Sequence, residues 1–134
     1  MLKFIPIAAQ AGISGFESPA AQYKESGLDL DAMLIDHPSA TYIGLAQGES
    51  MVGVGIYDND LLIVSRAETA RKGDVIVANL NGEFVCKIID PDRRLLISAS
   101  DAHVPHYVTD DDTFEIEGVV IRSVRLHRPL LTSR

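Results

Sequence analysis

The chain has 134 residues, a length that allows one domain with a hydrophobic core and leaves no room for a second independent domain. Its composition, 46% hydrophobic and 23% charged, is typical of a globular protein and excludes a disordered or fibrous one. The net charge of −7 repels phosphate and argues against tight direct DNA binding, while the single cysteine, Cys86, excludes an internal disulfide and fits a cytoplasmic protein.

Residues 1–17 combine glycine and proline with scattered apolar residues and show no sustained period, which predicts a mobile N-terminal arm. The apolar stretch at the start is interrupted by Pro6 and is too short for a signal peptide. No run approaches the roughly 20 apolar residues of a spanning helix, so no membrane association is expected. The domain proper is expected over residues 18–134.

Two short helices are predicted at the front of this domain. Ser18 and Pro19 favour a helix over 18–25, because serine caps a first turn and proline fits the first helical position. A second helix is predicted over 29–36. This helical region is interrupted and poor in basic residues, so it does not predict a DNA-reading helix-turn-helix.

Short β-rich runs follow as far as the C-terminal region. Asn81-Gly82 lies between two of them and predicts a hairpin, because both residues tolerate the positive φ of a type I′ turn. The pattern predicts a mostly β domain, a compact and curved antiparallel sheet with a barrel-like form. The predicted strands cover residues 41–46, 61–64, 74–80, 83–89, 95–98 and 114–126.

Ser50 is the candidate nucleophile. It lies in Gly48-Glu49-Ser50-Met51, between a predicted strand and a glycine-rich turn, where exposed backbone amides gather. A serine hydroxyl needs a base to take its proton at neutral pH. The four histidines offer no recognisable triad context.

Lys87 is the better candidate for that base. It is the sole cation in an otherwise apolar strand, and burial disfavours the charged ammonium. Lowering its pKa from about 10.4 to about 7 requires on the order of 4 kcal/mol. The alternative is a lysine whose stem packs on the sheet while its head reaches water.

Other polar residues have simpler interpretations. Alternation along the strand places Cys86 opposite Lys87 and in the core, and Met51 is expected to pack beside the nucleophile. The His103–His106 stretch is interpreted as a loop rather than a metal site, and Asp110–Asp112 as a solvated turn. No metal or cofactor is predicted. The basic residues of the tail are interpreted as a solvated edge or a subunit contact: Arg122, Arg125, His127, Arg128 and Arg134.

Seven short stretches in the same order resemble the UmuD proteins, LexA-related serine-lysine peptidases that trim their own N-terminal arm. The resemblance runs from about Ser14 to the C-terminal region and identifies Ser50 and Lys87 with the nucleophile and base of that family. The stretches are residues 15–21, 37–42, 48–51, 60–64, 72–78, 82–84 and 118–121.

The resemblance implies a β-rich homodimer that cuts itself on contact with a RecA filament on single-stranded DNA. The shortened form then joins a UmuC-type polymerase subunit in error-prone lesion bypass, part of the SOS response. The scissile bond maps to Ser14-Gly15, although this chain has serine where the family usually has cysteine or alanine. Ala11-Gly12 is the alternative. The arm, with 14 residues before the proposed cut, is also short for recognition by the filament.

The proposed mechanism has the arm lying as an added strand across the site. The backbone amides of Glu49, Ser50 and Met51 are the expected oxyanion donors. Two other functions remain open: a non-catalytic module that keeps the fold to bind a polymerase, and a peptidase that cuts other proteins.

Overall fold

The computed structural model describes residues 29–130. These residues fall into two units, 29–36 and 37–130, which are described separately. The arm predicted over 1–17 and the helix predicted over 18–25 lie outside the described residues, so both stay predictions. None of the helices within the described range is long and apolar enough to cross a membrane.

The first unit contains one short helix, α2 (Leu30–Leu34), which confirms the helix predicted in this region. Asp29 begins it, because its carboxylate accepts a hydrogen bond of 3.1 Å from the backbone N–H of Ala32. The helix ends at Ile35, whose backbone returns to an extended conformation.

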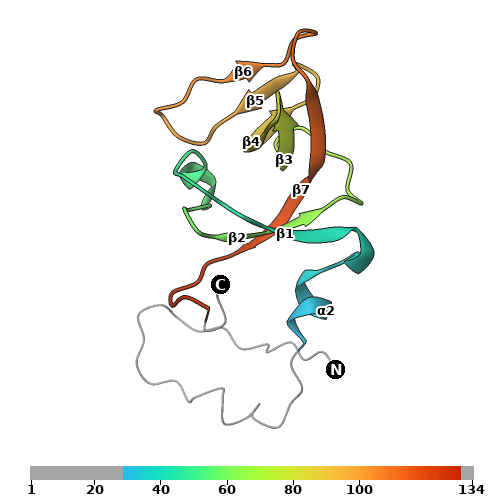
Figure 1. The fold of residues 1–134 in the computed structure, drawn as a ribbon, viewed down its shortest axis with the longest axis vertical. Coiled ribbons are helices and arrows are strands. Elements are labelled where there is room, and N and C mark those ends of the chain that lie inside the picture. Colours follow the sequence, from blue (N-terminus) through green and yellow to red (C-terminus); the bar gives the residue numbers. More distant parts are fainter. Residues whose placement is uncertain (1–28, 131–134) are drawn as a thin grey trace. The chain divides into compact units, whose positions relative to one another are not determined.

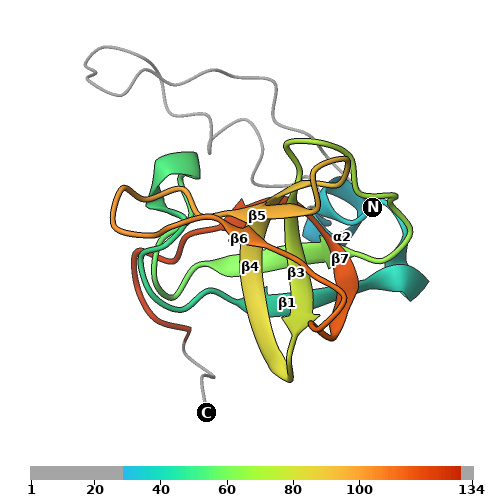
Figure 2. The same ribbon diagram turned by 90° about the horizontal axis from the view of Figure 1, so that it is seen from above.

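The second unit is a seven-stranded antiparallel sheet, in the order β1-β2-β7-β3-β4-β5-β6 (Figures 1 and 2). The mostly β, curved fold predicted from the sequence is confirmed, but among the described residues the sheet stays open, with β1 and β6 as its edges. Its elements are η1 (Pro38–Ala40), β1 (Thr41–Leu45), η2 (Val52–Val54), β2 (Leu61–Ser65), β3 (Val75–Leu80), β4 (Glu83–Asp90), β5 (Leu95–Ile97), β6 (His106–Tyr107) and β7 (Phe114–Val124), where η marks a 3-10 helix.

The predicted hairpin joins β3 to β4. Asn81 and Gly82 have φ values of 54° and 89°, and the strands close on the pair Leu80 and Glu83. The Asn81 side chain also donates to the Asp112 carboxylate at 2.9 Å and accepts from the backbone of Thr113 at 2.8 Å. The turn is therefore held by side-chain contacts as well as by backbone preference.

The prediction of a loop over residues 103–106 is wrong for His106, which begins β6 and pairs with β5. The turn over 110–112 is correct, but Asp112 is not merely solvated. Its carboxylate accepts from Asn81 and from the backbone of Thr109, and lies 3.1 Å from the His106 ring. These hydrogen bonds, that from Asn81 foremost, lower the pKa of Asp112 to about 2.

Two apolar clusters share the central strand β3, whose side chains alternate between them. Ile76 and Ala78 belong to the first cluster, whereas Val75 and Val77 pack on the second. The first has as its other buried members Ile89, Leu96, Val108 and Val119. The second is formed by Ala46, Met51, Ile56, Leu62 and Val64, so it includes the loop that carries the candidate nucleophile.

β7 connects the two halves of the sheet, since it pairs with β2 on one side and β3 on the other (Figure 1). Register shifts occur opposite it, between Ile63 and Val64 of β2 and between Val77 and Ala78 of β3. Bulges of this kind bend a strand and increase its twist. Gly118 lies at this bend with a φ of 156°, and a Cβ there would meet Val64 Cγ1 at 2.6 Å.

Gly118→Ala is expected to lower the free energy of unfolding by about 2 kcal/mol, because the added methyl group overpacks the bend. Denaturant unfolding measures the change. Gly44→Ala is the matched control, since a Cβ there meets nothing closer than 3.9 Å. Equal stabilities of the two variants would contradict the assigned role of Gly118.

Candidate functional site

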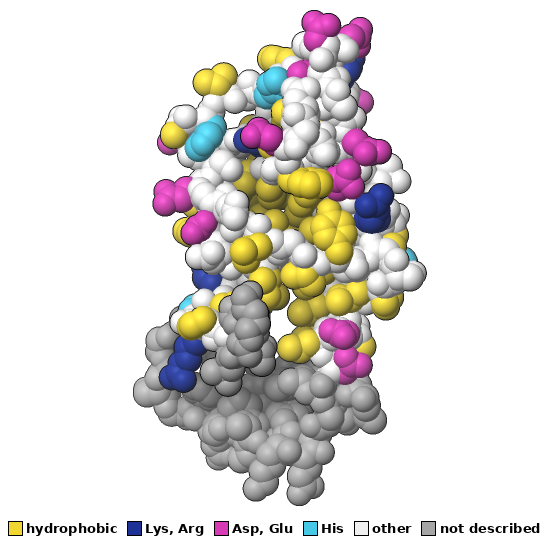
Figure 3. Space-filling view, viewed as in Figure 1, with side chains coloured by type: hydrophobic (Ala, Val, Ile, Leu, Met, Phe, Trp, Pro, Cys, Tyr) yellow, Lys and Arg dark blue, Asp and Glu magenta, His cyan; other side chains and the backbone are white. Residues whose placement is uncertain are grey.

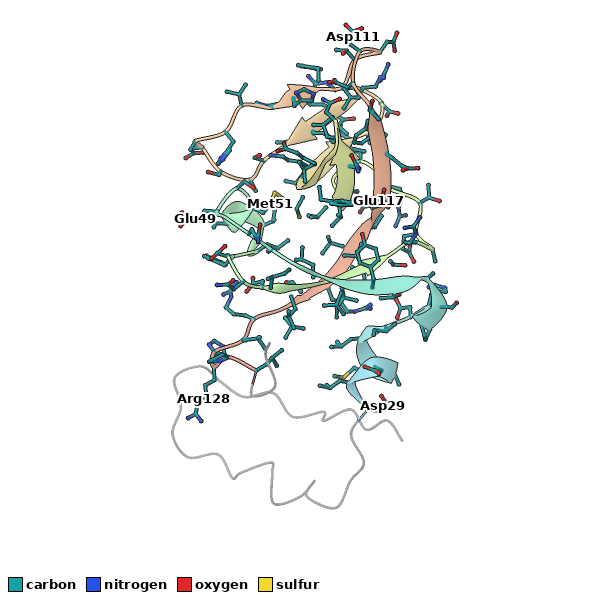
Figure 4. All side chains as sticks on the ribbon, in the orientation of Figure 1. Asp29, Glu49, Met51, Asp111, Glu117 and Arg128 are labelled. Carbon is teal, nitrogen blue, oxygen red and sulfur yellow. The ribbon has the colours of Figure 1, made fainter. Side chains whose placement is uncertain are left out.

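The loop between β1 and β2 presents Ser50 in a turn immediately before η2, as predicted. Gly48, with a φ of 84°, bends the chain after β1, and its N–H donates to Asp58 Oδ1 at 2.7 Å. Figure 4 shows Glu49 on the outer side of this loop and Met51 on its inner side. Met51 is 3% exposed and packs in the second apolar cluster, which confirms its predicted packing role.

The far end of the same loop is anchored by a buried ion pair. Asp60, 2% exposed, accepts two hydrogen bonds of 3.1 Å from Arg125 and one of 2.8 Å from the backbone N–H of Tyr57. The Arg125 guanidinium also donates to the Gly55 carbonyl at 2.8 Å and lies 4.1 Å from the centre of the Tyr57 ring. These hydrogen bonds, led by that from Arg125, lower the pKa of Asp60.

Arg125 thereby corrects the interpretation of the basic tail as a solvated edge. Although its side chain is 46% exposed, its guanidinium neutralises a carboxylate in the interior. The pairing could not be read from sequence because Asp60 and Arg125 are 65 positions apart.

Lys87 lies in β4 and is half-buried, less enclosed than the sequence predicted. Its Nζ donates to Ser98 Oγ at 2.7 Å. The antiparallel register explains the contact: Ile88 pairs with Ile97 of β5, so the preceding Lys87 faces the following Ser98.

Ser50 and Lys87 line the same cavity, of about 700 Å³. Most of its wall comes from the loop after β1, from β1 itself and from β4, while β2, β3 and β7 contribute Leu62, Val77 and Glu117. Leu45 and Phe84, 55% and 72% exposed, add large apolar groups to the lining. Figure 3 shows hydrophobic side chains gathered in the middle of one face of the β domain.

Polar groups that contact one another also line the cavity. Arg66 and Glu117 form an ion pair at 3.2 Å, and the Tyr42 hydroxyl donates to the Glu117 carbonyl at 3.4 Å. Burial, reinforced by Glu117, raises the pKa of Tyr42. Glu117 is labelled on β7 in Figure 4.

Cys86 packs against the second apolar cluster, in agreement with its predicted core position, and also lines the cavity. Burial raises the pKa of its thiol to about 11, opposed by the neighbouring Lys87. A thiol that stays protonated near neutral pH is a poor nucleophile.

The backbone amides of Glu49, Ser50 and Met51 donate to no acceptor among residues 29–130. Their carbonyls are engaged: that of Ser50 accepts from Ala99 at 2.7 Å, and that of Met51 accepts from Val54 at 3.1 Å. With respect to the described residues, the turn therefore leaves three N–H donors without an acceptor around the candidate nucleophile.

Within the described part of the chain, no three His, Cys, Asp or Glu side chains gather as metal ligands. His103 is exposed, and His106 contacts Asp112 at the end of the sheet that carries β6. The proposed scissile positions, Ser14-Gly15 and Ala11-Gly12, lie outside the described residues.

Comparison with known proteins identifies the family. A model of the family described as Peptidase S24-like matches residues 4–121. The chain belongs to this family. It is 38% identical to the protein ImpA of Salmonella typhimurium over 125 residues, which covers 91% of this chain and 81% of ImpA. It is 37% identical to the protein MucA of Escherichia coli over 125 residues, 92% of this chain and 86% of MucA.

A LexA repressor, from Syntrophotalea carbinolica, is 41% identical over 83 residues, 60% of this chain and 41% of that protein. The S24-like chain is thus similar to several UmuD-like proteins without being assigned to UmuD itself. This supports the LexA-related resemblance found in the sequence at the level of the family.

Sequence reasoning missed Ser98 and the Asp60–Arg125 pair. For Ser98, the predicted strands 83–89 and 95–98 indicate a hairpin near Lys87, but they do not fix which residue of the second strand lies opposite it. The register that decides this depends on the intervening turn, where Arg94 adopts a φ of 52°. A single-residue slip would have placed Ser98 on the other face.

Replacing Arg125 with methionine is expected to lower the melting temperature at pH 7, because the buried Asp60 carboxylate loses its main partner. A depressed pKa stabilises the fold above the unfolded value of about 3.9 and ceases to do so as pH falls through the folded value. The difference between variant and parent should therefore narrow below about pH 4. Arg128→Met, at an exposed position, is the control, and a pH-independent difference for Arg125→Met would contradict the role of the pair.

Proposed function

We propose that this protein is a serine peptidase that removes its own N-terminal arm, with Ser50 as nucleophile and Lys87 as general base. The observation that carries the proposal is the single cavity to which both side chains contribute. Membership of the S24-like family and the resemblance of residues 48–51 to the UmuD nucleophile motif support the same roles.

The chemistry requires Lys87 in its neutral form. Its amine accepts the proton of Ser50 Oγ while that oxygen bonds to the scissile carbonyl carbon. The proton then passes to the leaving amine as the C–N bond breaks, which leaves an ester on Ser50. A water molecule, deprotonated by Lys87, hydrolyses the ester, releases the arm as a carboxylate and restores the serine.

The uncommitted amides of Glu49, Ser50 and Met51 are the proposed donors to the oxyanion of the tetrahedral intermediate. Backbone N–H groups held by a rigid turn stabilise developing negative charge without reorganisation, and removing one such donor costs roughly 3 kcal/mol in other hydrolases. Gly48 donates a hydrogen bond to Asp58, and the Gly55 carbonyl accepts one from Arg125. Both contacts support this rigidity.

The substrate segment is proposed to be residues 1–17, cut at Ser14-Gly15, with Ala11-Gly12 as the alternative bond. Among residues 29–130, β1 is an edge of the sheet, and it also lines the cavity, so its outer side can pair with an extended peptide. Glycine after the scissile carbonyl lets the backbone approach the serine closely. Tethering the arm makes the attack effectively unimolecular.

The proposed partners follow from the resemblance to UmuD proteins: a second copy of the chain, a RecA filament on single-stranded DNA, and a UmuC-type polymerase subunit. The filament would act by favouring the docked arm. The net charge of −7 is consistent with DNA being held by those partners. The shortened chain would serve the SOS response as a subunit of an error-prone polymerase.

Full-length protein is expected to shorten by about the length of the arm when incubated near pH 10, because a lysine amine acts as a base only in its neutral form, which alkaline pH favours. Ser50→Ala and Lys87→Ala should stay intact. Ser123→Ala and Lys72→Ala are matched controls at exposed positions and should be cleaved like the parent. Intact mass spectrometry gives both the rate and the bond cut.

A product beginning at Gly15 supports the preferred bond, and one beginning at Gly12 supports the alternative. If parent and variants are equally inert, even with RecA filament present, the peptidase proposal fails and the non-catalytic polymerase-binding module takes its place.

Mixing Ser50→Ala with parent protein tests whether the arm can dock between chains. Slow shortening of the Ser50→Ala chain is expected only if one copy presents its arm to another, with a rate that rises with protein concentration. An unrelated unfolded protein serves as the control substrate. Its cleavage would point to a peptidase that acts on other proteins.

A further inference from the structure

Ser98 is the residue that holds the candidate base. The Lys87 Nζ to Ser98 Oγ distance of 2.7 Å is short for a hydrogen bond between a nitrogen and a hydroxyl oxygen. The contact joins facing positions of β4 and the chain just after β5, so the backbone of two paired strands holds it in place. Both side chains are half-buried, which limits competition from water.

The next residue, Ala99, forms backbone hydrogen bonds with the loop that carries Ser50. The Ala99 N–H donates to the Ser50 carbonyl at 2.7 Å, and the Ala99 carbonyl accepts from the Gly53 N–H at 2.7 Å. A Cβ at Gly53 would lie 2.6 Å from that carbonyl oxygen, so this approach requires glycine. Two consecutive residues therefore connect the side chain of the base to the backbone of the nucleophile.

We propose that Ser98 is a positioning residue that directs the Lys87 amine toward Ser50, an inference that rests on the proposed peptidase function. A neutral amine has two N–H groups and one lone pair. When Ser98 Oγ accepts one N–H, rotation of the long lysine side chain is restricted and the lone pair is left for the Ser50 proton. Once protonated, the amine keeps the same acceptor, so the contact survives the proton transfer.

The test compares Ser98→Thr with Ser98→Val, two side chains of nearly equal shape of which only threonine keeps the hydroxyl. Ser98→Val and Ser98→Ala are expected to cleave about tenfold more slowly than the parent, whereas Ser98→Thr should recover most of the rate. Melting temperatures measured on the same samples show whether each variant is folded.

A second measurement reports the contact without relying on cleavage. In Ser50→Ala protein labelled with [13C]lysine, NMR resolves the ε-methylene protons of the chain's four lysines, and Lys87→Arg assigns the signal of Lys87. Inequivalent ε-protons indicate a restrained amine. They should persist with Ser98→Thr and become equivalent with Ser98→Val, while the exposed Lys72 stays unchanged.

The outcomes separate the two proposals. If Ser98→Val leaves both the Lys87 signal and the cleavage rate unchanged while Ser50→Ala and Lys87→Ala are inactive, the peptidase stands and the positioning role is wrong. If the Lys87 signal changes but the parent never cleaves, the peptidase proposal fails and takes the catalytic role of Ser98 with it. If Ser98→Val is as inactive as Ser50→Ala while Lys87 stays restrained, Ser98 acts in the reaction other than by orienting Lys87, and the positioning role is overturned.

Discussion

The buried carboxylate of Asp60 is the constraint on which the geometry of the site depends. A charged group in the interior must be neutralised, and here the guanidinium of Arg125 does so while also donating to the Gly55 carbonyl. The backbone of Asp60 accepts from Ala46, and Asn59 donates to the Ala46 carbonyl. These contacts hold the two ends of the loop that carries Ser50 close together. The turn at Ser50 is therefore supported from both sides.

The sheet supplies the other half of the site through strand pairing. β3 separates two apolar clusters, and β4 beside it carries Lys87 to the cavity. The bend of β7 at Gly118 lets one long strand pair with both β2 and β3. The curvature of the sheet therefore shapes the site, because it brings the edge strand β1 and the interior strand β4 to the walls of one cavity.

Ser98 and Ala99 connect these two halves. One bonds to the lysine side chain of β4, and the other bonds to the loop between β1 and β2. If Lys87 and Ser50 act together, the distance between them depends on the contacts of Ser98 and Ala99 as well as on the conformations of β4 and of the loop between β1 and β2. The requirement for glycine at position 53 follows from the same close approach.

Local chemistry by itself determined the β class, the Asn81-Gly82 hairpin and the turn at Ser50, because turn preferences and alternation act over a few residues. The motif around Ser50 and the isolated cation at Lys87 were also visible in the sequence. The tertiary structure alone decided that Arg125 neutralises Asp60 and that Ser98 holds Lys87. The physical reason is separation along the sequence. Register and sheet curvature bring together residues that are 11 to 65 positions apart, and no local sequence pattern encodes these contacts.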